Sequence, residues 1–187
     1  MHLSILGRIV QVSSGAGPMF VQKCREDIQT LLANTPNVTW NEVEANVIEP
    51  AIHISQNTAL TLEEKSRQSM EKGLGEMSGI YFYGLAKACV NTYTYILSKQ
   101  QPNIIMNSCS PGFIQTDLTK PWLKSSGKTP EEMGMLPVEK GTIAPVHLLM
   151  NNLEGNGRYY GSDGKRSPMH KYRSPEYDGP EYDGTFP

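Results

Sequence analysis

Three short strand-like runs, separated by long segments with helical spacing, restrict the fold of this chain more than any other feature. Residues 7–14 are a β-branched run that ends in small residues and leads into a glycine-containing turn. Residues 103–109 form a second run, stopped by Ser-Pro-Gly, and residues 157–161 form a third. Strands that alternate with helices favour a parallel sheet. We therefore predict an α/β fold with about three parallel strands flanked by helices.

The segments between these runs carry the signals of helices. Residues 20–79 are predicted to be all helix and turn, and residues 61–64 offer a capping box for a helix. Residues 129–132 offer a second cap, with a proline at the first helical position. Residues 138–153 have helical spacing, and Pro145 is expected to kink that helix.

The end of the sequence has a different character from the rest. The pentapeptide Pro-Glu-Tyr-Asp-Gly occurs at 175–179 and again at 180–184. It contains no aliphatic side chain to bury, so we expect residues 171–187 to form an exposed or disordered tail. The preceding residues, 1–170, suit a single domain.

Charge and hydropathy argue against nucleic-acid and membrane partners. The 17 basic and 19 acidic side chains give a net charge of -2, too balanced for a nucleic-acid footprint. No apolar stretch approaches the roughly 20 residues of a membrane span. Residues 1–12 have neither the basic nor the apolar region of a secretory leader.

Cysteine and histidine positions give no sign of a metal site. Cys24, Cys89 and Cys109 lack the spacing of metal ligands or redox pairs, and we expect reduced thiols in the cytoplasm. The histidines are scattered and are interpreted as structural or surface residues. They are His2, His53, His147 and His170.

Tyr83 and Lys87 are the candidate chemical pair. Their spacing places both side chains on one face of a helix, where an ammonium favours the phenolate and prepares the tyrosine for proton transfer. Tyr95 and Lys99 have the same spacing. They lie twelve residues on, about 18 Å along a helix and about 120° around it, so they cannot serve the same pocket. We interpret them as a surface pair.

Three motifs taken together resemble a known family. Residues 7–14 (GRIVQVSS), 83–88 (YGLAKA) and 110–117 (SPGFIQTD) look like the second half of a short-chain dehydrogenase/reductase. The resemblance covers roughly residues 5–165. It implies a partial Rossmann-like sheet, with residues 1–170 as the C-terminal portion of the family's domain.

The segment between the serine and the tyrosine refines this resemblance. Residues 20–79 are similar to an insert of the monomeric carbonyl reductases of the family, whose extra helices cover the surface that other members use to dimerise. The resemblance therefore implies a monomer.

The resemblance also implies the catalytic roles. Ser14 would hydrogen-bond the substrate carbonyl, Tyr83 would donate the proton, and Lys87 would hold the nicotinamide ribose and tune Tyr83. The hydride would come from NADPH. Ser14 can also be read as a simple strand-end residue.

The resemblance assigns the remaining cofactor contacts to the loop after the second strand. Pro111 and Gly112 would shape the loop beside the nicotinamide, the Ile114 backbone would face the carboxamide, and Thr116 would bind the carboxamide or a phosphate. Two alternatives stay open: Pro111 and Gly112 as an ordinary turn, and Thr116 with Asp117 as a helix cap.

The sequence does not contain the nucleotide-binding βαβ units of the family. Their turn has glycines at i, i+4 and i+6, and no glycine here begins a complete set. Without the strands that carry that turn, the strand at residues 9–12 would have one bare edge. We therefore expect the chain to be truncated, with an incomplete cofactor site.

These inferences lead to two alternative functions. The first is an NADPH-dependent oxidoreductase that reduces a small-molecule carbonyl to an alcohol and is impaired as it stands. The second is a non-catalytic interaction protein that docks through the bare sheet edge. A partial reading of a longer gene is a third possibility.

Overall fold

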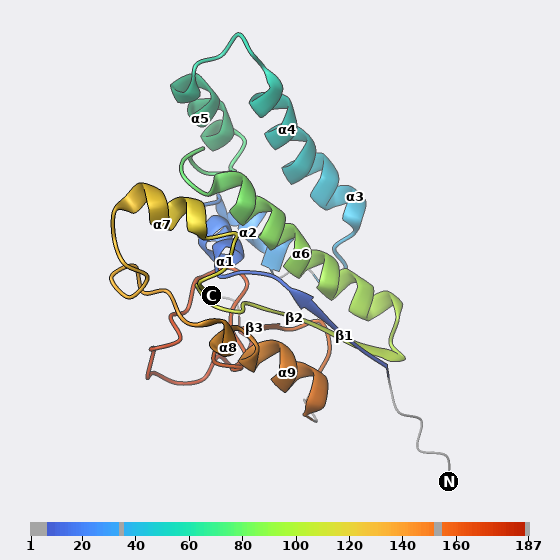
Figure 1. Ribbon diagram of the computed structural model, residues 1–187. Helices are drawn as coiled ribbons and strands as arrows, with labels where there is room; N and C mark the ends of the chain where they lie inside the picture. Colours follow the sequence, from blue (N-terminus) through green and yellow to red (C-terminus); the bar gives the residue numbers. More distant parts are fainter. Residues whose placement is uncertain (1–6, 34–35, 152–154, 186–187) are drawn as a thin grey trace.

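The computed structural model describes residues 7–33, 36–151 and 155–185. Its sheet has three parallel strands in the order β1-β2-β3. These strands are β1 (Gly7–Val12), β2 (Ile104–Cys109) and β3 (Tyr159–Tyr160), at the three places that the sequence predicts. Figure 1 shows the sheet with helices on both faces. The predicted class, an α/β fold with a partial Rossmann-like parallel sheet, is confirmed.

The pairing of β1 with β2 positions the site. Gly7 is opposite Ile104, and the register continues to Val12 opposite Cys109. Because the strands are parallel, β1 and β2 end at the same edge of the sheet, where ligands bind in such folds. β1 is an outer strand that pairs only with β2 among the residues that the structure describes.

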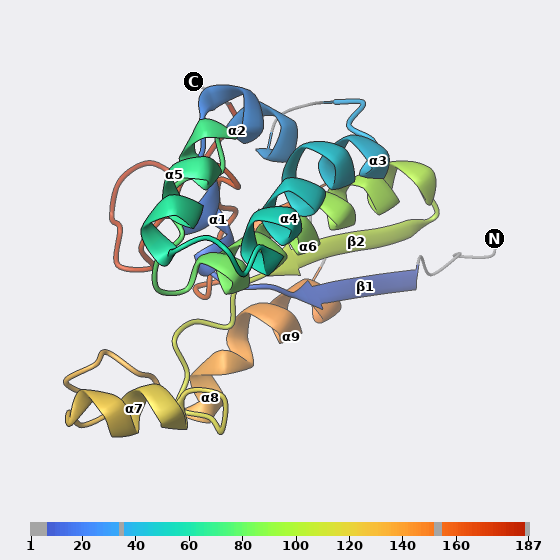
Figure 2. The same ribbon diagram turned by 90° about the horizontal axis from the view of Figure 1, so that it is seen from above.

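Two helices cover opposite faces of the sheet. α6 (Tyr81–Gln100) packs on one face with α1 (Ala16–Val21) against it, and α9 (Ile143–Met150) lies on the other face (Figure 1, Figure 2). The remaining helices are α2 (Glu26–Ala33), α3 (Trp40–Val43), the π-helix η1 (Glu44–Ile48), α4 (Glu49–Gln56), α5 (Leu62–Glu71), α7 (Lys120–Ser126) and α8 (Val138–Gly141).

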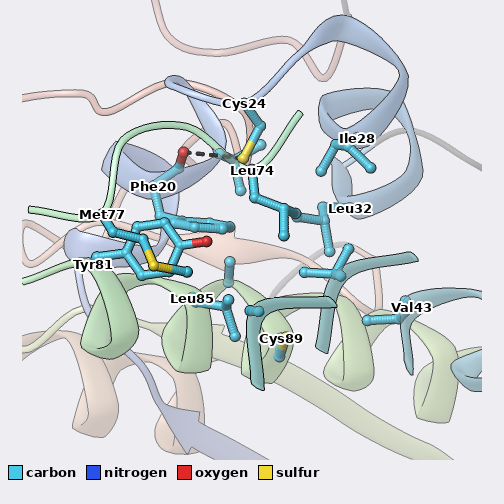
Figure 3. Packing of buried hydrophobic residues seen from close by; sticks show 14 of the residues in the cluster. Phe20, Cys24, Ile28, Leu32, Val43, Leu74, Met77, Tyr81, Leu85 and Cys89 are labelled. Carbon is cyan, nitrogen blue, oxygen red and sulfur yellow. Dashed lines mark hydrogen bonds between the residues drawn. The ribbon is translucent and has the colours of Figure 1, made fainter. Parts of the chain in front are cut away.

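Helices from residues 20–79 pack on the outer side of α6 and build the main core there. Figure 3 shows Phe20, Cys24 and Leu74 in one hydrophobic cluster with side chains of α6, Leu85 and Cys89 among them. Burial raises the pKa of each cysteine thiol (Cys24, Cys89 and Cys109) to about 12, with Asp27 adding to the effect at Cys24. All three cysteines are free.

The predicted caps give one helix and one turn. Thr61 and Glu64 form the expected capping box at the start of α5. Thr129 and Glu132 make the same reciprocal hydrogen bonds, at 2.8 and 3.2 Å, but residues 130–134 form only a turn. The prediction of a helix that begins after Thr129 is therefore wrong.

The helix expected at 138–153 is interrupted. It divides at Thr142 into α8 and α9. Pro145 has no N–H to donate to the carbonyl of Gly141, so the hydrogen-bond ladder breaks one turn before the proline. The predicted end of that helix at residue 153 lies outside the described residues. Residues 1–6, with His2 among them, also lie outside the described residues.

No helix in the described ranges combines the length and the apolar character needed to cross a membrane. Residues 171–185 contain no helix or strand and are mostly exposed.

Candidate active site

A cavity of about 1130 Å³ lies where β1 and β2 end. Its walls come from the loops after these strands, the first half of α6, the loop before α8 and the C-terminal residues 172–176. Every site residue that the sequence analysis proposes lines this one cavity. These residues are Ser14, Tyr83, Lys87, Pro111, Gly112, Ile114 and Thr116.

α6 presents Tyr83 and Lys87 to the cavity one helical turn apart. The Lys87 Nζ lies 5.7 Å from the centre of the Tyr83 ring and donates a hydrogen bond of 3.0 Å to the carbonyl oxygen of Val12. The ammonium is thus fixed between the tyrosine and the end of β1. The pair Tyr95 and Lys99 has a similar internal geometry, 5.1 Å, but neither residue lines the cavity.

Close backbone contact between α1 and α6 brings the end of β1 to this pair. A Cβ atom on Gly84 would lie 2.9 Å from the carbonyl oxygen of Ala16, so the two helices touch there through glycine. Ser13, beside them, donates its hydroxyl to the carbonyl oxygen of Lys87 at 3.1 Å. The turn that carries Ser14 is therefore tied directly to α6.

Ser14 keeps a hydroxyl proton for a ligand. Its Oγ accepts a hydrogen bond of 3.1 Å from the N–H of Ala16. The structure records no acceptor for the Ser14 O–H itself among the described residues, and the side chain lines the cavity. Ser14 can thus donate to an oxygen atom bound beside Tyr83.

Ser110 holds the two loops of the cavity together, a role that the sequence analysis did not identify. Its Oγ accepts hydrogen bonds of 3.2 Å from the N–H groups of Gly15 and Gly112. The Ser-Pro-Gly motif marks Ser110 as a turn residue. Its hydrogen bond with Gly15 could not be predicted, because Gly15 is distant in the sequence. Gly112 has φ +96°, where L residues are strained, and a Cβ there would lie 3.2 Å from that of Ser162.

Ile114 and Thr116 offer backbone and side-chain donors from the loop after β2. The Ile114 carbonyl accepts a hydrogen bond of 2.9 Å from the Thr119 hydroxyl, whereas the Ile114 N–H has no partner in the described ranges. Thr116 is exposed at the rim. The N-cap of α7 is Thr119, and the Thr116 side chain makes no capping hydrogen bond.

The C-terminal residues 172–176 were not expected in the site. Arg173 anchors them through a fork of hydrogen bonds to the Asp163 carboxylate, at 2.9 and 2.6 Å, with side chains only 10% and 18% exposed. Burial raises the pKa of the Asp163 carboxyl, but hydrogen bonds from Arg173 and from the Lys165 backbone outweigh it, so the pKa lies below its ordinary value. The carboxylate therefore stays charged at neutral pH.

Comparison with known proteins places the chain near one family, although no family model matches it. It is 29% identical over 154 residues to a short-chain dehydrogenase/reductase of Saponaria officinalis, covering 82% of this chain and 43% of that protein. It is 27% identical to (+)-neomenthol dehydrogenase of Arabidopsis thaliana, covering 80% of this chain and 43% of that protein. It is 26% identical to carbonyl reductase (NADPH) 3 of Mus musculus, covering 77% of this chain and 45% of that protein.

The solved structure of salutaridine reductase from Papaver somniferum matches 85% of this chain and 46% of its own, with 21% identity and a TM-score of 0.49. The chain spans less than half the length of the curated relatives named above. Over about four fifths of its own length it resembles the short-chain dehydrogenases/reductases, carbonyl reductases among them.

Proposed function

We propose that this chain carries the catalytic and nicotinamide-binding part of an NADPH-dependent reductase that converts a small-molecule carbonyl into an alcohol. The observation that carries the proposal is the convergence of Ser14, Tyr83 and Lys87 on one cavity. One of the relatives is named as a carbonyl reductase that uses NADPH, which supports the same reaction.

Three side chains act on the carbonyl group in this proposal. The hydroxyls of Ser14 and Tyr83 donate hydrogen bonds to the carbonyl oxygen, which polarises it. Tyr83 then passes its proton to the oxygen as negative charge develops there. Lys87, fixed by the Val12 carbonyl, holds positive charge beside the ring while the phenol gives up its proton.

The loop after β2, which carries Ile114 and Thr116, suits the binding of a nicotinamide. The N–H of Ile114, which has no partner among the described residues, can donate to a carboxamide oxygen, and the exposed hydroxyl of Thr116 can bind the carboxamide or a phosphate. Lys87 would also contact the ribose. When bound, the reduced nicotinamide supplies the hydride.

The phosphate-binding turn is not supplied by residues 1–187, since no three glycines have the required spacing. A large share of the cofactor's binding energy would then be missing, and an unpositioned hydride donor reacts slowly. Reductase activity of these residues alone is therefore expected to be impaired.

Titration of NADPH against the purified chain, followed by fluorescence, tests the proposal. Saturable binding supports it, and the dissociation constant can lie above about 100 µM because the phosphate-binding turn is not supplied. Tyr83→Phe should leave this affinity largely intact and Lys87→Ala should weaken it. Tyr95→Phe and Lys99→Ala, at the second pair with the same spacing, should change nothing. Equal effects at the two pairs would contradict the proposal.

The outer edge of β1 supports a second candidate function, an interaction protein that adds a strand from a partner. Within the described ranges β1 pairs on one side only, and Ile9 and Val12 are 39% and 52% exposed. No NADPH binding together with concentration-dependent association in sedimentation would favour this function. A monomer that binds NADPH would favour the reductase.

The cytoplasmic location, which the sequence analysis expects from the cysteine positions, stays a prediction.

A further inference from the structure

A second, smaller cavity adjoins the first. It has a volume of about 270 Å³, large enough for a single ring, and lies between α1 and the start of α6. Phe20, Leu74 and Tyr81 supply apolar side chains to its lining. The candidate active site does not include this cavity.

Four residues line both cavities and therefore form the boundary between them: Ala16, Met19, Ile80 and Tyr172. Tyr172 is the only one of the four that comes from the C-terminal residues rather than from α1 or the start of α6. It also lies outside residues 5–165, over which the motifs resemble the reductase family.

The Tyr172 ring is held tightly against the turn that carries Ser14. An ideal Cβ atom built on Gly15 would lie 2.8 Å from Cε2 of the Tyr172 ring, so the ring packs on the bare glycine backbone. Gly15 directly follows Ser14, which places the ring one residue from the proposed carbonyl-binding hydroxyl.

Two further contacts fix the backbone on either side of this ring. The Tyr172 N–H donates a hydrogen bond of 3.2 Å to Oε1 of Gln22 at the end of α1. The next residue, Arg173, makes the buried fork to Asp163. The ring therefore packs on Gly15 while two contacts hold the backbone that carries it, and it can act as a wall between the cavities.

We propose that Tyr172 is a specificity-determining residue that closes the main cavity toward the smaller one and so limits the length of the ligand. The walls of the main cavity include Phe113, Trp122 and Leu136, so the ligand class is a carbonyl compound with an apolar body that does not extend past Tyr172. An elongated compound cannot place a second ring in the smaller cavity, because that ring would need the space of the Tyr172 side chain. The carbonyl part of this inference rests on the proposed function.

Binding of two ketones to the full chain, measured by calorimetry, tests the inference. Acetophenone is the compact probe and 4-acetylbiphenyl the elongated one. In Tyr172→Ala the affinity for 4-acetylbiphenyl relative to acetophenone should rise at least about fivefold, because burial of an added ring becomes possible. Tyr172→Phe retains the ring and should leave the ratio unchanged.

Gly15→Ala provides a second variant that keeps the tyrosine. The new methyl group displaces the Tyr172 ring from its position against residue 15. The affinity for 4-acetylbiphenyl relative to acetophenone should therefore rise, as in Tyr172→Ala. This variant carries the test if Tyr172→Ala fails to fold. Tyr177→Ala, an exposed tyrosine of the tail that lines neither cavity, is the matched control and should leave the ratio unchanged.

The same titrations with benzene and biphenyl separate this inference from the proposed function. A rise in the biphenyl ratio supports the role of Tyr172, even where the ketones bind no better than the hydrocarbons and the carbonyl site itself fails. An unchanged ratio in the folded Tyr172→Ala or Gly15→Ala variant overturns the inference. So does an equal rise in Tyr177→Ala.

Discussion

Single residues hold the candidate site together through contacts between distant parts of the chain. Tyr83 and Lys87 could be predicted, because their spacing lies within one helix and the motif around them resembles a family. Ser110 and Tyr172 could not, because their partners Gly15 and Gln22 are brought to them only by the fold. Local patterns identify which residues can react, whereas long-range packing decides what surrounds them.

Gly84 tests the close approach of α1 and α6. Gly84→Ala places a methyl group 2.9 Å from backbone and side-chain atoms of α1, which cannot move without shifting that helix. We expect the free energy of unfolding to fall by about 1–3 kcal/mol in urea denaturation, the usual cost of overpacking. Gly7→Ala is the control, because its methyl group meets no atom within 4 Å. Equal stability of the two variants would contradict the close contact.

Asp163 tests the anchor of the C-terminal residues. Its folded-state pKa lies below the ordinary value of 3.8, so its contribution to stability is present above that pH and is lost as the pH falls through the folded-state pKa. Asp163→Asn should therefore lower the free energy of unfolding by about 2 kcal/mol at neutral pH. The difference from the unsubstituted chain should shrink in acid.

Denaturation curves at several pH values measure this difference. Asp27→Asn is the matched control, since both side chains of its ion pair with Arg25 are more than half exposed and the pair should contribute much less than the pair of Asp163 with Arg173. A gap between Asp163→Asn and the unsubstituted chain that stays constant into acid would contradict the role of the carboxylate.

Elements of secondary structure follow local signals only where the following sequence allows a helix to continue. Thr61 and Thr129 both make reciprocal capping hydrogen bonds. After Thr61 the chain has ten residues of helix, but after Thr129 it meets Gly134, at φ +69°, which ends the turn. The caps were predicted correctly, and the missing helix reflects a glycine that the cap pattern ignores.

The two caps should differ in their effect on stability. Thr61→Ala removes the cap of α5 and should cost about 1 kcal/mol of the free energy of unfolding, measured in urea. Thr129→Ala should cost clearly less, because only one exposed turn depends on it. If Thr129→Ala were the more harmful change, the turn would have to support more of the molecule than its contacts indicate.

At the scale of the whole molecule, the positions and parallel direction of the strands could be predicted, whereas the course of the C-terminal residues could not. The β-branched runs and their turns are local signals, so the three strands lie where expected. The tail contains no aliphatic residue in its repeat, and nothing local indicates that Tyr172 and Arg173 return to the cavity. An ion pair with a residue ten positions away makes that return.

The outer edge of β1, which pairs with no strand in the described part of the chain, should be visible in amide hydrogen exchange. The Ser13 N–H donates to Cys109, and alternate N–H groups of a strand point to the same side, so those of Ile9 and Gln11 face β2. Those of Val10 and Val12 face the outer edge. We expect slow exchange at Ile9 and Gln11 and fast exchange at Val10 and Val12 in dilute solution. Equal protection at all four would show that the edge is covered.

The central claim is that the cavity around Tyr83 and Lys87 binds a reduced nicotinamide. Titration of the ¹⁵N-labelled chain with reduced nicotinamide mononucleotide, followed by amide chemical shifts, tests it without requiring the adenosine-binding turn. The expected result is a saturable shift that is largest at the Ile114 amide, that includes Thr116, and that is weakened by Lys87→Ala. Shifts that avoid these amides, or none at ligand concentrations that saturate other nicotinamide sites, would contradict the claim.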